Sequence, residues 1–139
     1  MIRYRTFHHT ADLGIDIYGR TVEALFVHAA EAILELLTDP KAVCGEKTIL
    51  LRVEGIDGPD LLVNFLREIL DQLYGNRLLF KKIRILHRSE NTLCAEARGE
   101  SLNPAKHRLR REIKAVTHHQ ASLIREKSGR WHARVILDV

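Results

Sequence analysis

The chain has 139 residues, of which 45% are hydrophobic, and this is enough to bury a core without disulfides and excludes an intrinsically disordered chain. Its two cysteines, Cys44 and Cys94, follow no metal-binding spacing, and no apolar stretch approaches the length of a membrane span. We therefore expect a single cytoplasmic domain over residues 1–139, without membrane contact. The net charge of +4 is unevenly spread, because residues 1–40 carry three basic and six acidic side chains, whereas residues 103–134 carry nine basic and two acidic. This basic region suggests contact with a polyanion, and a solvated basic strand face is the alternative.

The first predicted elements are two strand-like segments on either side of Asp12, the second of them over Leu13–Tyr18. A helix is predicted over Thr21–Thr38, where apolar residues recur at steps of three and four. Thr21 has the side chain of a good N-cap, and Pro40 stops the helix.

The middle of the chain predicts a strand and a second helix. Alternating residues over Ile49–Gly55 predict the strand. The helix is expected from about Pro59 to Tyr74, with proline in its first turn and Gly75-Asn76 at its end.

The remaining elements are all predicted strands. Lys82–His87 and Thr92–Ala97 flank the turn residues Ser89-Glu90-Asn91 and form a hairpin. Three more strands are expected over Glu112–His118, Gln120–Glu126 and Trp131–Asp138, with Ser128-Gly129 as the last turn. Together these elements predict an α+β fold, in which a mostly antiparallel sheet of about seven strands has two amphipathic helices on one face.

The end of the last predicted strand carries a candidate cation site. Asp138 places a side-chain carboxylate beside the α-carboxylate of Val139, and two such anions repel unless a cation or N–H donors hold them. Asp12 could supply a third oxygen, and Ca²⁺ takes about six to eight oxygen ligands and Mg²⁺ about six, including water. Taken separately, Asp12 could cap a turn and Asp138 could be a surface acid that shares the polar strand face with Arg134 and His132.

Other charged residues have a functional and a structural interpretation. Lys114 is expected on the polar face of its strand with Glu112 and Val116, where it could neutralise phosphate or pair with an acid. Asp60, Asn64 and Glu68 recur on one side of the second helix, either as solvated surface or as an acidic ridge for a partner. Zinc is not favoured by the histidine pairs, because neighbours in a strand point to opposite faces.

Short motifs, in order and in register from end to end, resemble the archease family. They are His9-Thr10-Ala11-Asp12 before a strand, Gly19-Arg20-Thr21 opening a helix that ends in Leu37-Thr38-Asp39, Leu61–Leu66 with Glu68, Gly99-Glu100, Lys106-His107, Glu112–Thr117 and Val135–Val139. The stretch Arg108–Arg111 is more basic than the family pattern, and His118 replaces the usual aromatic residue.

The resemblance implies a function that composition does not show. Archeases are small cytosolic cofactors, not enzymes, of the RtcB-type RNA ligase in tRNA splicing and RNA repair, and they promote guanylylation and multiple turnover of the ligase. The resemblance implies metal ligands at Asp12, Asp138 and the Val139 carboxylate, with Ca²⁺ favoured over Mg²⁺. It implies an essential lysine at Lys114, and further recurrent acidic positions at Asp39 and Glu68.

Two mechanisms and two other functions stay open at this point. The protein could bring positive charge to the ligase or stabilise a competent ligase conformation. It could instead be a stand-alone RNA- or tRNA-binding module that uses its basic C-terminal half, around Lys106–Lys114. A metal-dependent hydrolase is disfavoured because no convincing general base accompanies Asp12 and Asp138.

Overall fold

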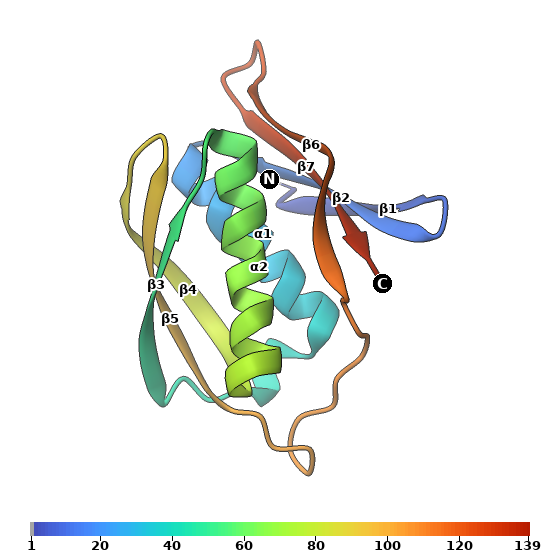
Figure 1. Ribbon diagram of the computed structural model, residues 1–139, viewed down its shortest axis with the longest axis vertical. Helices are drawn as coiled ribbons and strands as arrows, with labels where there is room; N and C mark the ends of the chain where they lie inside the picture. Colours follow the sequence, from blue (N-terminus) through green and yellow to red (C-terminus); the bar gives the residue numbers. More distant parts are fainter. Residues whose placement is uncertain (1) are drawn as a thin grey trace.

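Two antiparallel sheets lie on either side of two helices in the computed structural model, which describes residues 2–139 (Figure 1). In chain order the elements are β1 (Tyr4–His9), β2 (Asp12–Gly19), α1 (Val22–Leu37), the 3₁₀-helix η1 (Pro40–Ala42), β3 (Lys47–Glu54), α2 (Gly58–Asn76), β4 (Leu78–Arg88), β5 (Thr92–Ser101), β6 (Ala115–Arg125) and β7 (Trp131–Asp138). The first sheet has the order β1-β2-β7-β6 and the second the order β3-β5-β4, and all neighbouring strands are antiparallel. The predicted α+β fold is therefore confirmed for the described residues.

The strands divide into two sheets, where the sequence pattern predicted one. Helix α1 packs against β2 and β4, and α2 packs against β6 and β3, so each helix contacts both sheets. Alternation along a strand shows which side chains share a face, but it does not show which strands pair. Each sheet has the helices on one face, as predicted.

Both helices begin at the residues that the sequence indicates. The hydroxyl of Thr21 accepts a hydrogen bond from the backbone of Ala24 at 3.1 Å, and Asp57 caps α2 by accepting from Asp60 at 2.9 Å. Helix α2 extends past the predicted end at Gly75, because the left-handed residue that terminates it is Arg77, with φ of 54°.

The core lies between the helices and the two sheets. Phe26 of α1 and Phe65 of α2 are both 0% exposed, and their ring centroids are 5.8 Å apart. Truncating an aromatic side chain buried to this extent costs about 3–5 kcal/mol. This contact therefore fixes the two helices to each other between the sheets.

The two strands predicted over Glu112–His118 and Gln120–Glu126 are one strand, β6, so that prediction was wrong. Its pairing with β7 shifts register between Thr117 and Ser122, and Gln120 within the shift has a left-handed φ of 55°. Sequence alternation is interrupted there without ending the strand. Val116 was also misplaced on the polar face, since it pairs with Leu137 and is 0% exposed.

The face of the first sheet that points away from the helices is less polar than predicted. Arg134 and Asp138 lie on it, but their neighbour Ile136 is 0% exposed. Beside Ile136, Gly14 of β2 lies under the ring of Phe7, and a Cβ at Gly14 would meet that ring at 2.2 Å. Glycine is therefore needed for Phe7 to lie on the sheet.

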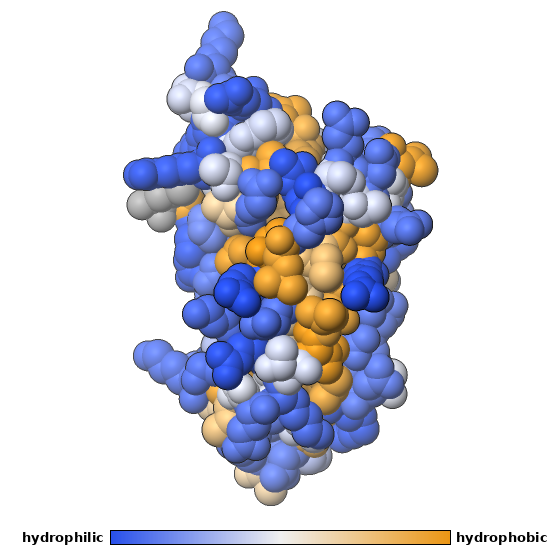
Figure 2. Space-filling model, turned by 90° about the vertical axis from the view of Figure 1, so that its left-hand side faces the viewer, coloured by the Kyte–Doolittle hydropathy of each residue, from blue (hydrophilic) through white to orange (hydrophobic). Residues whose placement is uncertain are grey.

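The second sheet forms the left-hand side of Figure 1, which faces the viewer in Figure 2. Apolar side chains gather there among charged ones, and Leu50 of β3 and Leu86 of β4 are among the exposed large apolar residues. Neither helix between residues 2 and 139 combines the length and apolar character needed to cross a bilayer.

Candidate metal centre at the end of the four-stranded sheet

Asp12 and Asp138 meet because β2 and β7 are neighbours in the first sheet. The last pair of the ladder is Leu13 with Leu137, and the same antiparallel register continued by one residue sets Asp12 opposite Asp138. Both leucines are buried toward the helices, and alternation therefore directs both aspartates to the opposite, open face. Two residues far apart in sequence are thus brought together at one end of one sheet.

A tight turn holds Asp12 at this end. His9 pairs with Asp12, and only Thr10 and Ala11 join the two strands. Thr10 has a left-handed φ of 53°, which is uncommon for a β-branched residue. A positive φ at the first loop residue is what a two-residue hairpin turn requires, so the tightness of the turn accounts for this conformation.

Lys114 lies at the same end of the sheet, immediately before β6. Its backbone N–H donates to the carbonyl of Asp138 at 2.7 Å. The Tyr74 hydroxyl of α2 holds the preceding residue, Ile113, by donating to its carbonyl at 2.9 Å and accepting from its N–H at 3.2 Å. Arg67 Nε holds Val116 by donating to its carbonyl at 2.9 Å. Helix α2 thus fixes the chain on both sides of Lys114.

The side chain of Lys114 borders a shallow pocket of about 300 Å³ between α2 and β6. Arg67 lines the same pocket and adds a second positive charge, while Asp71 adds one negative charge. The strand pattern predicted Lys114 on a polar face with Glu112, but Lys114 precedes the strand and faces α2. Sequence reasoning did not identify Arg67, because nothing in the helix pattern indicates which strand its polar side meets.

The carboxylates of Asp12 and Asp138 have no hydrogen bond or ion pair with any other described residue. Asp16, farther along the same face, is different, because Arg134 binds both of its oxygens at 2.9 and 3.0 Å and His132 Nε2 lies 2.9 Å from Oδ1. Burial raises the pKa of Asp16, but the hydrogen bonds from Arg134 and His132 outweigh burial and hold that pKa below its ordinary value. Asp16 is therefore neutralised locally, whereas Asp12 and Asp138 remain open to a ligand.

The donors fit a hard divalent cation. The carboxylates of Asp12 and Asp138 offer oxygen only, as Ca²⁺ and Mg²⁺ prefer. Among the side chains that the structure describes, no three from His, Cys, Asp or Glu converge as a metal site would require. The predicted set contains only two such side chains, and the α-carboxylate and water would have to supply the other oxygens.

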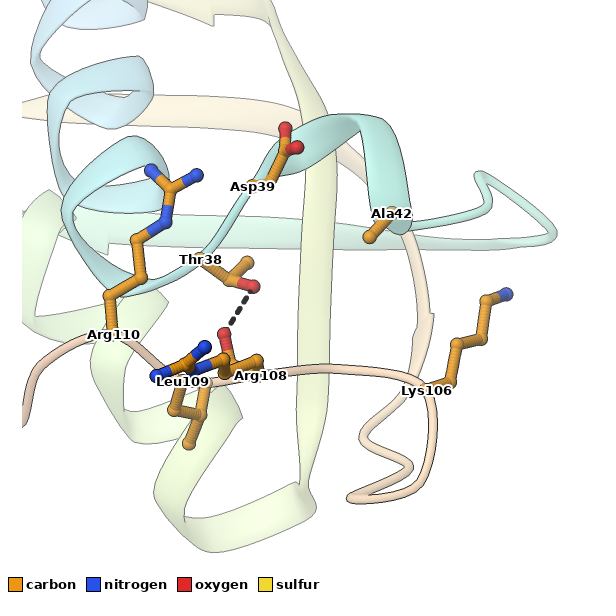
Figure 3. Close-up of a pocket in the computed structure, with 7 residues that line it drawn as sticks. All are labelled: Thr38, Asp39, Ala42, Lys106, Arg108, Leu109 and Arg110. Carbon is orange, nitrogen blue, oxygen red and sulfur yellow. Dashed lines mark hydrogen bonds between the residues drawn. The ribbon is translucent and has the colours of Figure 1, made fainter.

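Asp39 lies away from this centre. It precedes η1 and borders the first part of the segment that leads from β5 to Lys114. Its Oδ1 caps η1 by accepting from the backbone of Lys41 at 3.0 Å. Figure 3 shows the pocket of about 510 Å³ that Asp39 borders, and its other lining residues are Thr38, Ala42, Lys106, Arg108, Leu109 and Arg110. The Thr38 hydroxyl donates to the Arg108 carbonyl at 2.8 Å across this pocket. Asp39 thus shares the lining of this pocket with three basic residues, and it forms no ion pair with any of them.

Glu68 is also separate from Lys114. It accepts a hydrogen bond from Gln72 at 2.9 Å, and Asn64, one turn earlier, donates to the Glu54 carbonyl of β3 at 2.8 Å. Glu68 therefore belongs to the β3 side of α2, whereas Arg67 and Tyr74 face β6. In the acidic row predicted on this helix, Asp60 already has a partner within the protein, because its Oδ1 lies 2.7 Å from His118 Nε2.

Sequence reasoning missed a cluster around Glu100. This carboxylate accepts from the Cys44 backbone, from Lys106 Nζ at 2.9 Å and from His107 Nε2 at 3.0 Å. The Cys44 N–H and then Lys106 lower the pKa of Glu100 to about 2. The motifs Gly99-Glu100 and Lys106-His107 were the only sequence signal, and the structure explains why they occur together.

Comparisons with known proteins agree over the full length of the chain. The model of the Archease protein family matches residues 4–139. The chain is 34% identical to a protein archease of Sulfolobus acidocaldarius and 34% identical to one of Pyrococcus abyssi, over 100% of each chain. Its fold is similar to the solution structure of a Methanobacterium thermoautotrophicum protein, with a TM-score of 0.79, 31% identity and 99% of both chains covered. It is also similar to the crystal structure of an archease, described as a possible chaperone, from Thermotoga maritima, with a TM-score of 0.63, 19% identity and coverage of 97% and 96%.

Proposed function

The chain belongs to the archease family, and from this we propose that it is a metal-binding accessory protein of an RtcB-type RNA ligase. It acts in tRNA splicing and RNA repair, in the cytoplasm, by promoting guanylylation and repeated turnover of the ligase. It is an activator and carries out no nucleotidyl transfer itself. The observation that supports this most directly is that Asp12 and Asp138 lie at one end of the first sheet, where the Lys114 backbone N–H donates to the Asp138 carbonyl.

Asp12, Asp138 and the Val139 carboxylate would hold a divalent cation, with Ca²⁺ favoured over Mg²⁺. When bound, the cation supplies positive charge beside phosphate oxygens on which negative charge develops during guanylylation. The Lys114 side chain adds a second positive charge at the same end of the sheet, on the side that faces α2. Its backbone is fixed by Asp138, and its neighbours are fixed by Tyr74 and Arg67, so little further ordering is needed on docking.

Asp39 and Glu68 contribute to activation at other places on the protein. Asp39 borders the basic pocket and Glu68 lies toward β3, so neither is a ligand of the proposed cation. We assign them to contacts with the ligase, at separate points of its surface.

The test is a guanylylation assay with the purified ligase, GTP and divalent metal, with and without this protein. Asp12→Ala and Asp138→Ala should each abolish stimulation of guanylylation and turnover. Glu90→Ala, in the β4–β5 turn, removes an exposed acid far from the centre and should stimulate like the unaltered protein. Normal stimulation by both aspartate variants would overturn the proposal.

A chain extended by one glycine after Val139 tests the terminal ligand separately. The extension moves the α-carboxylate away while leaving every side chain in place, so Ca²⁺ affinity measured by calorimetry should fall. Unchanged affinity and unchanged stimulation would remove the Val139 carboxylate from the ligand set and leave the aspartates in it.

A further inference from the structure

The segment between β5 and β6 has no regular secondary structure, yet the protein fixes it at several points. Leu102 N–H donates to the Arg77 carbonyl at 2.7 Å, and Arg110 N–H donates to the Leu37 carbonyl at the end of α1 at 2.7 Å. At its far end, Lys114 is fixed to Asp138. Its backbone is therefore held in place before any ligand binds.

This fixed segment carries a dense row of positive side chains, which we call the basic ridge, residues 106–114. Arg108, Arg111 and Lys114 are exposed and form no ion pair with any described residue. Lys106 is neutralised by Glu100, and Arg110 donates from Nη1 to the Glu35 carbonyl at 3.1 Å. Three cations of the ridge are thus available, and Arg108 and Arg110 both border the pocket in Figure 3.

We propose that the basic ridge binds the phosphate backbone of RNA. Guanidinium groups hold phosphate oxygens with two parallel hydrogen bonds, and arginine is the basic residue best suited to this contact. The ridge contains no Phe, Tyr or Trp for base stacking, and His107 is buried, so the ridge recognises phosphates and does not read the base sequence. An acidic protein partner fits less well, because the centres of protein interfaces are depleted of charge and Leu109 is the only exposed large apolar residue of the ridge.

The position of the ridge predicts the path that bound RNA takes over the protein surface. The ridge runs from the pocket beside Asp39 to Lys114, whose backbone contacts Asp138 of the candidate metal centre. RNA that follows the ridge therefore reaches Lys114 on the α2 side of the sheet end whose open face carries Asp12 and Asp138. This inference goes beyond the proposed activation of the ligase, and RNA binding can be measured without the ligase.

The test compares two double substitutions that change the net charge equally. Arg108→Glu with Arg111→Glu reverses two free cations of the ridge. Arg125→Glu with Lys127→Glu reverses two exposed cations at the β6–β7 hairpin, at the opposite end of the molecule in Figure 1. Binding to a fluorescein-labelled, unstructured RNA of about 20 nucleotides and to tRNA is followed by anisotropy at several salt concentrations.

The unaltered protein should bind both RNAs with an affinity that falls steeply with salt. The ridge variant should bind at least about tenfold more weakly, and the slope of log affinity against log salt should decrease by about 2, because two fewer phosphates are neutralised. The hairpin variant should stay within about threefold of the unaltered protein. Circular dichroism checks that both variants are folded.

Three outcomes would overturn the inference. One is the absence of salt-dependent RNA binding by the unaltered protein. Another is equal weakening by both variants, which would mean that only net charge matters. The third is normal RNA binding by a ridge variant that no longer binds the ligase, which would make the ridge a protein-binding surface. Loss of RNA binding with normal ligase activation leaves the proposed function standing, so the two proposals fail separately.

Discussion

Acidic side chains have hydrogen-bond partners at one place in the protein and lack them at another. Glu100 accepts hydrogen bonds from Cys44, Lys106 and His107, and it fastens the loop after β5 to the segment after η1. Asp12 and Asp138 stand side by side at the end of the first sheet with no partner among the described residues. A carboxylate with every partner in place holds the fold, whereas adjacent carboxylates without partners repel each other until a cation binds. The contrast separates structural acids from acids kept for a ligand.

The largest effect should follow from neutralising the unpaired acids. Asp12→Asn with Asp138→Asn removes both charges at constant size and should weaken Ca²⁺ binding more than about 100-fold, measured by calorimetry. The melting temperature without metal should not fall, because repulsion between the carboxylates is removed as well. Retained Ca²⁺ affinity, or a large loss of metal-free stability, would remove the distinction between the two sites.

Substitution at the paired acid should have the opposite pattern. Glu100→Gln should lower the melting temperature and leave Ca²⁺ affinity unchanged, because the amide cannot hold Lys106 and His107 as a carboxylate does. Amide exchange at Cys44 and in the following loop should accelerate about tenfold, the factor expected from one charged hydrogen bond. Hydrogen exchange followed by mass spectrometry makes the measurement, and protected amides in the variant would show that Glu100 does not fasten the loop.

The hydrogen bonds to Glu100 should also make the stability of the protein sensitive to acid. The pKa of Glu100 is lowered in the folded protein from 4.5 to about 2, mainly by the Cys44 N–H and Lys106. Its stabilising effect is therefore complete above pH 4.5 and disappears as the pH falls toward about 2. Glu100→Gln should flatten the dependence of unfolding free energy on pH across this window. Identical acid limbs for the variant and the unaltered protein would contradict the assigned pKa.

The smallest effect concerns two lysines, Lys106 at the Glu100 cluster and Lys114 near the unpaired aspartates. Lys106 is paired with Glu100, whereas Lys114 has no ion-pair partner among the described residues. Lys114→Met should therefore change the free energy of unfolding by less than about 0.5 kcal/mol, while Lys106→Met should lower the melting temperature measurably. Thermal denaturation decides this, and equal effects would show that both lysines are structural. Stimulation of the ligase should disappear only with Lys114→Met.

Local chemistry made the helices and most strands predictable. Thr21 and the sequence Asp57-Gly58-Pro59 mark helix starts through short-range hydrogen bonds, and turn residues mark two hairpins. The division into two sheets was not predictable in this way, because pairing depends on contacts between distant strands. The long strand β6 was divided in the prediction because its register shift near Gln120 interrupts the alternation without ending the strand.

The candidate site was predictable to different degrees. The resemblance indicated Asp12, Asp138 and Lys114, but only the pairing of β2 with β7 places the two aspartates together. Arg67 was not predicted, because the sequence does not fix the orientation of its helix. The contact between Cys44 and Glu100 spans 56 residues and joins the loop after η1 to strand β5. Residues that meet through tertiary packing alone leave no periodic signal.

The position of β7 in its sheet also bears on protein synthesis. This strand follows all others in the sequence, yet it lies in the interior of the sheet between β2 and β6, and its Arg134 binds Asp16 across 118 residues. A nascent chain that lacks β7 has unpaired strand edges at β2 and β6, and Leu13, Ile15 and Ile17 lack their cross-strand neighbours Leu137, Val135 and Ala133, which favours aggregation. Because the same strand supplies Asp138, an incompletely synthesised chain has neither a closed sheet nor a pair of carboxylates for the cation.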